Sequence, residues 1–395
     1  MNTLLSRQVV RPLTTIFAIQ TLLTTAAYTL PVVIPSAAPD IGIYPDAVGF
    51  FVAGIYGTAM IVGLISGELL TRLGPTRVFQ LLLLLAGAGA LVLGTGAFWA
   101  AVLAAVLIGA SSGPMNPAGS TVLEKVTTPS SRALVFSLKQ CATPAGGMVA
   151  GTLLPLLTLS VGWHWAVMVV PAAALILIAV APFGALGGSA ETQRPGESIT
   201  TAMLAAFATL AQPAIRAVTL TGFGLAVCQM GLATYLVVYL WSNVGYSPEK
   251  AGFIFAVLHM SGIASRVVLG LVADRLLAAR LVLVWIAITL SACLALLAVL
   301  DDGWPEVAVF ALIVITGASG NGWVGLYFAE LARLSPAGKI AEVAAGSQFL
   351  TYLGIVCGPL LIGVVLGTTG SFAICFTLLA ILSLVCGAYL IRAAH

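Results

Sequence analysis

Charge is the scarcest property of this chain of 395 residues. Only 7% of the residues are charged whereas 60% are hydrophobic, and the mean hydropathy is +1.12. A soluble protein of this length needs much more charged surface to remain in water. The composition therefore excludes a soluble globular protein. It indicates a chain whose solvent is the lipid bilayer, and no nucleic acid is expected as a partner.

Residues with reactive side chains are also few, and they are not grouped into a site. The six cysteines all fall inside apolar segments, which excludes a disulfide framework. The three histidines, His164, His259 and the terminal His395, stand far apart, so no metal-ligand cluster is expected. There is no nucleophile–base pairing, no phosphate-binding glycine loop and no ATP motif. We therefore expect no enzyme activity, no metal and no cofactor.

Long apolar segments recur along the whole chain. A bilayer core about 30 Å thick is crossed by roughly 20 apolar residues, because a helix satisfies its own backbone groups. The segments lie near residues 12–35, 47–70, 78–97, 99–121, 133–158, 164–186, 214–241, 250–273, 281–300, 306–330, 341–366 and 371–391. They predict an all-α membrane protein with twelve transmembrane helices. The first segment lacks a cleavage site and is too long for a signal peptide, so we expect it to be retained.

The distribution of basic residues predicts the orientation in the membrane. An even number of spans places both termini on one side, and nearly all basic residues outside the spans fall on that side. These are Arg7, Arg11, Arg72, Arg77, Lys125, Arg132, Arg194, Arg216, Arg275, Arg280, Arg333, Lys339 and Arg392. Because positively charged loops remain in the cytoplasm, both termini are expected there. The chain is expected in the cytoplasmic membrane of a bacterium.

The longest polar interruption divides the chain into two parts. Residues 187–200 contain Gly, Pro, Ser and charges of both signs, which is typical of a linker. This pattern predicts an N-terminal six-helix bundle over residues 1–186, a cytoplasmic linker over 187–213 and a C-terminal six-helix bundle over 214–395.

The two predicted bundles carry the same sequence pattern. Corresponding residues are Gly67 with Gly270, Arg72 with Arg275, Arg77 with Arg280, Glu124 with Glu330, and Gln140 with Gln348. Internal repetition on this scale is how many transporters build two bundles around a central site.

The segment from Gly67 to Arg77, together with its weaker copy containing Asp274, resembles the signature loop of the major facilitator superfamily. The resemblance covers essentially the whole chain and implies two pseudo-symmetric bundles. In the family an acid in this loop helps to latch the outward-open state, but Thr71 stands at its position here, with Glu68 as a substitute candidate. The resemblance assigns a gating role to Gly67, Arg72, Arg77, Glu124, Asp274, Arg275, Arg280 and Glu330. Residues 136–147 are similar to bacterial cyanate- and organic-anion-permease-like members.

Two basic residues fall inside predicted spans, where a charge is costly. Lys139 lies about 10 Å and Arg266 about 12 Å along their helices from the same boundary, and no acid lies at that depth in either span. In the superfamily these two spans come from opposite halves and meet, so an anionic substrate would neutralise both charges. Two alternatives stay open: Lys139 reaches water along its own stem, or Arg266 only bonds carbonyl groups or the Asp274 loop.

Arg266 also resembles the cation that carboxylate carriers of the monocarboxylate and oxalate type use in their eighth span. His259 shares its helix face and is a candidate proton carrier, a role that competes with a hydrogen bond to a neighbouring helix. Other polar residues form stripes on the spans that line the cavity in the superfamily, although such residues also join helices. The candidate substrate-binding set is Lys139, Arg266, His259, Gln20, Tyr28, Asn116, Gln140, Gln229, Tyr235, Asn321, Gln348 and Tyr352.

Together these features predict a monomeric secondary transporter that moves a small organic anion, preferably a carboxylate, by alternating access. Proton coupling is left open. The alternative within transport is efflux of neutral or cationic small molecules, which fits poorly because no Asp or Glu lies in the central third of any span. A second alternative, a membrane sensor that transports nothing, fits poorly because every loop is too short for a soluble domain.

Overall fold

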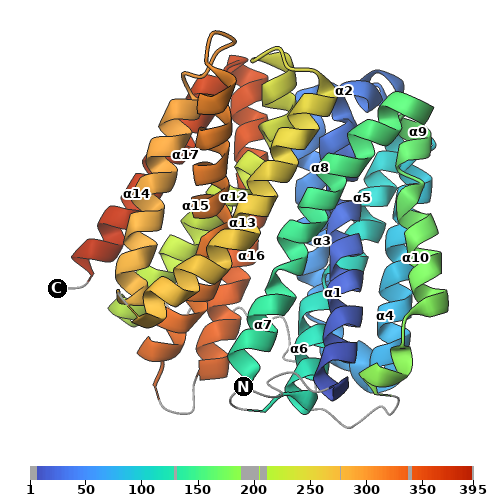
Figure 1. Cartoon of the computed structure of the whole chain (residues 1–395), viewed down its shortest axis with the longest axis vertical. Helices are drawn as coiled ribbons and strands as arrows, with labels where there is room; N and C mark the ends of the chain where they lie inside the picture. Colours follow the sequence, from blue (N-terminus) through green and yellow to red (C-terminus); the bar gives the residue numbers. More distant parts are fainter. Residues whose placement is uncertain are drawn as a thin grey trace. The chain divides into compact units, whose positions relative to one another are not determined.

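The structure is a computed structural model that describes residues 7–128, 131–187, 204, 211–275, 277–336 and 340–393. Helices make up all of its regular secondary structure over these residues (Figure 1). Most of the predicted linker, 187–213, lies outside them. The chain forms two compact units. Unit 1 contains Met1–Ile43 and Gly54–Glu197, and unit 2 contains Tyr44–Ala53 and Ser198–His395.

The helices of the first half are short and frequently interrupted. They are α1 (Arg7–Ala27), α2 (Thr29–Ile41), the 3₁₀ turn η1 (Pro45–Ala47), α3 (Val48–Gly63), α4 (Ser66–Leu93), α5 (Phe98–Ser112), α6 (Met115–Val126), α7 (Arg132–Gln140), α8 (Ala142–Val161), α9 (Trp163–Ala166), α10 (Val169–Val180) and η2 (Phe183–Leu186). Several pairs form one span in two pieces; α1 and α2, for example, cross as the single segment Gln8–Ile41.

The helices of the second half are longer. They are α12 (Pro213–Ser242), α13 (Pro248–Arg275), α14 (Ala279–Leu297), α15 (Glu306–Leu334), α16 (Ile340–Thr369) and α17 (Phe372–Arg392). Within unit 2 they pack mainly in pairs, α12 with α16, α13 with α15 and α14 with α17. The pairing of α13 with α15 brings Arg266 next to Asn321, as described below.

Twelve helical segments are long and apolar enough to cross a membrane. This confirms the predicted number of spans and the all-helical fold. Each predicted span overlaps one of these segments, and the ends differ by a few residues in most cases. The side of the membrane on which the termini lie stays a prediction.

The signature segment Gly67–Arg77 differs from its expected form. The second span was expected to run to residue 70 and to be followed by a loop, but α3 ends at Gly63 and α4 already begins at Ser66. The segment is therefore helical apart from one break at Gly74, which has φ 74° and ψ 160°. Only glycine adopts these angles readily, and Pro75 then restarts the helix with a suitable φ. A glycine–proline step thus turns the chain where a loop was predicted.

A short segment of the first half belongs to the second compact unit. Residues Tyr44–Ala53, which include η1 and the start of α3, cluster with unit 2. Tyr235 on α12 holds them, because its hydroxyl donates to the carbonyl oxygen of Asp46 at 2.7 Å and accepts from the backbone N–H of Gly49 at 3.2 Å. The helix α3 therefore begins in one unit and continues in the other.

We expect Gly74→Ala to lower the free energy of unfolding by about 1–3 kcal/mol, because alanine is strained at these backbone angles. Thermal unfolding of the purified protein would measure the effect. Gly57→Ala is the matched control, since a Cβ on this α3 glycine meets nothing within 4 Å. It should be neutral or stabilise the helix by about 0.5–1 kcal/mol. Equal effects of the two substitutions would contradict the role of Gly74.

Candidate binding site

Lys139, the basic residue predicted inside a span of the first half, lies deep inside unit 1. The side chain of Lys139, near the end of α7, is only 1% exposed. Its ammonium group donates to the main-chain oxygen of Asn116 and to the hydroxyl oxygen of Ser120, both at 3.0 Å and both on α6. The lysine stem therefore runs to the backbone of a neighbouring helix and not to the surface, so the alternative in which it reaches water does not describe this state.

Gln20 lies in the same unit on α1. Its amide nitrogen donates to the hydroxyl oxygen of Thr143 on α8 at 2.9 Å. Its amide oxygen is buried and has no hydrogen-bond partner among the described residues. Such an atom costs about 1–3 kcal/mol when it stays unpaired, so an unfilled acceptor of this kind is typical of a functional position.

Arg266, the basic residue predicted inside a span of the second half, also donates to a main-chain oxygen. The Nε of Arg266 on α13 donates to the main-chain oxygen of Asn321 on α15 at 3.0 Å. This hydrogen bond is the kind expected under the alternative in which Arg266 bonds a carbonyl group. Arg266 also makes further interactions. In each unit, an intramembrane cation is held by the main-chain oxygen of an asparagine in the fourth span of its half.

A chain of side-chain hydrogen bonds continues from Asn321. The indole N–H of Trp323 donates to the amide oxygen of Gln229 at 2.9 Å, and the amide nitrogen of Gln229 donates to the side-chain oxygen of Asn321 at 3.1 Å. The side-chain nitrogen of Asn321 in turn lies 3.3 Å from the main-chain oxygen of Gly317. The chain joins α12 and α15 at the residue that also binds Arg266.

The close approach of α13 and α15 depends on a glycine. An added Cβ on Gly262 would lie 2.6 Å from the Cβ of Asn321, which real side chains essentially never allow. Asn321 is 5% exposed and Trp323 is 2% exposed. The sequence pattern identified Gln229 and Asn321 but missed Trp323. Its position two residues after Asn321 is the only signal that was available.

The other candidate substrate-binding residues are placed differently. His259 is 2% exposed with its Nδ1 at 3.0 Å from the carbonyl oxygen of Phe255, one turn earlier on α13. Tyr235 is fully buried, and its hydroxyl is occupied by Asp46 and Gly49 as described above. Tyr28 is also buried, whereas Gln140, Gln348 and Tyr352 are partly exposed. Contact of any of these residues with a solute stays a prediction.

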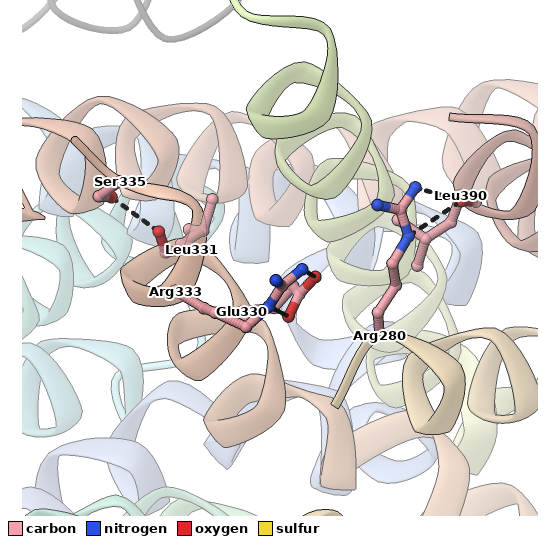
Figure 2. Close-up of polar contacts among 6 residues, drawn as sticks. All are labelled: Arg280, Glu330, Leu331, Arg333, Ser335 and Leu390. Atoms are coloured by element: carbon pink, nitrogen blue, oxygen red, sulfur yellow. Dashed lines mark hydrogen bonds and ion pairs between the residues drawn. The ribbon is translucent and has the colours of Figure 1, made fainter. Parts of the chain in front are cut away.

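Two candidate gating residues of the second half, Glu330 and Arg280, have hydrogen-bond partners within unit 2. Glu330 is 1% exposed, and both of its carboxylate oxygens accept from Arg333 one turn later on α15, at 2.8 and 2.7 Å (Figure 2). Figure 2 also shows Arg280 directed at the main-chain oxygen of Leu390, to which it donates at 2.6 Å. Arg280 therefore binds the C-terminal end of α17, where a positive charge interacts favourably with the helix dipole.

In unit 1 the corresponding positions are exposed. Arg72 forms an ion pair with Glu68 on the same helix at 2.5 Å, and the hydroxyl of Thr71 donates to the main-chain oxygen of Gly67 at 2.8 Å. Arg77 and Glu124 are exposed, and Glu124 has a further partner. The side chains of Asp274 and Arg275 lie outside the described residues. The role of the whole set in gating stays a prediction.

Over the described ranges no group of three or more His, Cys, Asp or Glu is arranged to hold a metal ion. Each unit, taken by itself, contains a basic side chain between apolar helices that donates to neutral oxygen atoms. Such an arrangement can bind a solute that carries negative charge and oxygen acceptors.

Comparison with known proteins identifies a matching family and a similar protein. The family described as Major Facilitator Superfamily matches residues 16–359. The chain is also similar to the Probable galactarate/D-glucarate transporter GudP of Bacillus subtilis (strain 168), with 27% identity over 394 residues. That alignment covers 87% of this chain and 82% of the relative.

The buried carboxylate of Glu330 leads to a stability prediction. Arg333→Ala should lower the free energy of unfolding by about 2–3 kcal/mol, because it leaves a buried charge without its donors. Adding Glu330→Gln should recover part of the loss, since a neutral amide is cheaper to bury. The control is Arg72→Ala, whose ion pair is exposed and should contribute about 1 kcal/mol or less. Chemical or thermal unfolding of the three variants measures these free energies. Similar losses of unfolding free energy in Arg333→Ala and Arg72→Ala would contradict the expectation.

Proposed function

Because the chain belongs to the major facilitator superfamily, it is a multi-pass membrane transporter, and we propose that its cargo is a small organic anion of the carboxylate class. Transport proceeds by alternating access, the mode that internally repeated bundles imply. The chain lies in the cytoplasmic membrane of a bacterium with both termini inside, as the basic loops indicate.

One observation carries the proposal: two basic side chains, Lys139 and Arg266, lie inside spans that hold no acidic residue at the same depth. Lys139 lies five residues and Arg266 four residues from the nearer end of its span. Among the acidic residues of these spans only Glu330 lies as deep, and Arg333 pairs with it. The partners of Lys139 are neutral oxygens, and so is the acceptor of the Arg266 Nε. A positive charge in an apolar medium remains costly without a counter-charge. An anionic cargo supplies that charge and a cationic one would add to the cost.

Arginine favours a carboxylate in particular. Its guanidinium group is planar, stays charged and carries five N–H donors in a fork that matches the two oxygens of a carboxylate. In Arg266 the Nε is directed at Asn321, which fixes the plane of the fork relative to α15. The similar Bacillus subtilis protein is named as a transporter of galactarate and D-glucarate. Both are dicarboxylates, and this likeness supports the same class of cargo.

A screen of purified protein tests the cargo class. Dicarboxylates and hydroxycarboxylates, with D-glucarate among them, should raise the midpoint of thermal unfolding, because a ligand of the folded state stabilises it by RT ln(1 + [L]/Kd). Lipophilic cations should leave the midpoint unchanged. A protein stabilised by such cations but by no carboxylate would refute the proposed class.

Substitution of Arg266 tests whether this side chain binds the carboxylate. Arg266→Ala should weaken carboxylate binding by about a hundredfold, since a charged hydrogen bond of about 1.5–3 kcal/mol is lost with part of the charge attraction. Arg266→Lys should retain part of the affinity, because lysine supplies the charge without the fork. Uptake into proteoliposomes gives the same readout for transport. Unchanged saturable uptake by a folded Arg266→Ala protein would remove Arg266 from the proposal.

We propose that Lys139 attracts the carboxylate cargo as a second positive charge. One substitution distinguishes this role from a purely structural role in helix packing. Lys139→Met keeps most of the side-chain volume and removes the charge. We expect a drop in carboxylate uptake of about tenfold or more without loss of thermal stability, because an apolar side chain carries no desolvation cost at a buried position. If stability falls and uptake by the remaining folded protein is normal, Lys139 only ties α7 to α6.

A further inference from the structure

Gln229 is the accessible residue in the buried middle of α12. From Gly224 to Leu240, α12 is buried at every position except Gln229. This polar side chain sits near the middle of the span Pro213–Ser242, at a depth where an amide exposed to lipid would be costly. Its accessibility in such a helix therefore indicates that it faces space open to a polar molecule.

The orientation of the Gln229 amide is determined by Trp323. The two ends of a glutamine amide are normally assigned from their surroundings, and an indole N–H can only donate. The oxygen of Gln229 therefore faces Trp323, at 2.9 Å, and its nitrogen faces the side-chain oxygen of Asn321, at 3.1 Å. The indole N–H is shared with the main-chain oxygen of Gly320, at 3.1 Å. A reversed amide would place two donors against each other at Trp323.

This arrangement leaves a donor for the solute. The nitrogen of Gln229 carries two hydrogens, of which one is directed at Asn321. The second has no partner among the described residues. The same asparagine receives the Nε of Arg266 on its main-chain oxygen. Asn321 thus anchors two donor groups, one charged and one neutral, from two different helices.

We propose that Gln229 binds the cargo as a hydrogen-bond donor and selects solutes with an oxygen acceptor beyond the carboxylate on Arg266. Trp323 is a positioning residue that acts through Gln229 by preventing its amide from rotating. The proposal rests on the proposed carboxylate cargo and specifies its second functional group. Solutes with an ammonium group at that position are rejected, because a donor then meets a donor.

Three ligands of similar size test this selectivity. Succinate and monomethyl succinate present oxygen acceptors at the second end, the first charged and the second neutral, whereas 4-aminobutyrate presents only donors. Affinities are measured by thermal shift on the purified full-length protein. The wild-type protein should prefer succinate and monomethyl succinate over 4-aminobutyrate by about a hundredfold or more, since a site built for one hydrogen-bond polarity strongly rejects the other.

The variants separate the two residues. Trp323→Phe should reduce the preference for monomethyl succinate over 4-aminobutyrate by about tenfold, because the freed amide can turn its oxygen toward the ammonium group. Gln229→Leu should weaken both oxygen ligands by about tenfold and leave 4-aminobutyrate unchanged. Gln229→Leu also serves if Trp323→Phe does not fold. Trp285→Phe is the matched control, since this tryptophan of α14 is 57% exposed, and it should behave as wild type.

The outcomes distinguish this inference from the proposed function. If the wild-type protein binds neither oxygen ligand, or if Arg266→Ala binds them as tightly as wild type, the carboxylate site itself fails and the inference fails with it. If Arg266→Ala abolishes binding while Trp323→Phe and Gln229→Leu keep the wild-type preference, only the inference is overturned. A loss of preference in Trp285→Phe as large as in Trp323→Phe also overturns it.

Discussion

The cost of holding positive charge in an apolar helix bundle is the constraint on which the rest of this structure depends. No acid lies at the depth of Lys139 or Arg266 in its own span, and a lone charge there costs roughly 2.5–3.5 kcal/mol or more. The structure meets part of this cost with oxygen atoms that carry no charge. The donors of both cations reach a main-chain oxygen of an asparagine, Asn116 in one unit and Asn321 in the other. A neutral oxygen acceptor orients the N–H group that it binds and adds no charge of its own.

The two units reach this arrangement with different helices. Each has a glutamine in its first span, Gln20 or Gln229, and an asparagine in its fourth span, as expected for repeats of one pattern. The cation, however, comes from the fifth span in unit 1 and from the second span of the repeat in unit 2. The two repeats therefore share the asparagine whose main-chain oxygen accepts the hydrogen bond, and they differ in the basic residue that donates it. Such a difference lets the two halves of a transporter play unequal roles in binding, although they descend from one pattern.

Several features could be predicted from the sequence because they depend on chain-wide patterns. Twelve spans follow from the length and spacing of the apolar runs. In the hydrocarbon core of a bilayer, every backbone N–H and C=O group must find its hydrogen-bond partner within the protein, so each run forms a helix. The candidate cations, Gln229 and Asn321 stood out because polar side chains are rare in these spans. Other features depend on contacts between helices. Glu330 pairs with Arg333 on the same helix, and the loop expected at Gly67–Arg77 is a helix broken at Gly74.

What this sequence determined by itself is a membrane transporter fold of twelve spans, because this property is a sum over many residues and tolerates local error. Only the tertiary structure decided which polar atoms meet. Trp323 stands out along the chain only by its position near Asn321, yet its indole N–H meets the amide oxygen of Gln229. Likewise, residues Tyr44–Ala53 belong to the compact unit of the second half through Tyr235. Hydrogen bonds act over about 3 Å. A pairing between residues far apart in the chain is therefore defined only once the helices have packed.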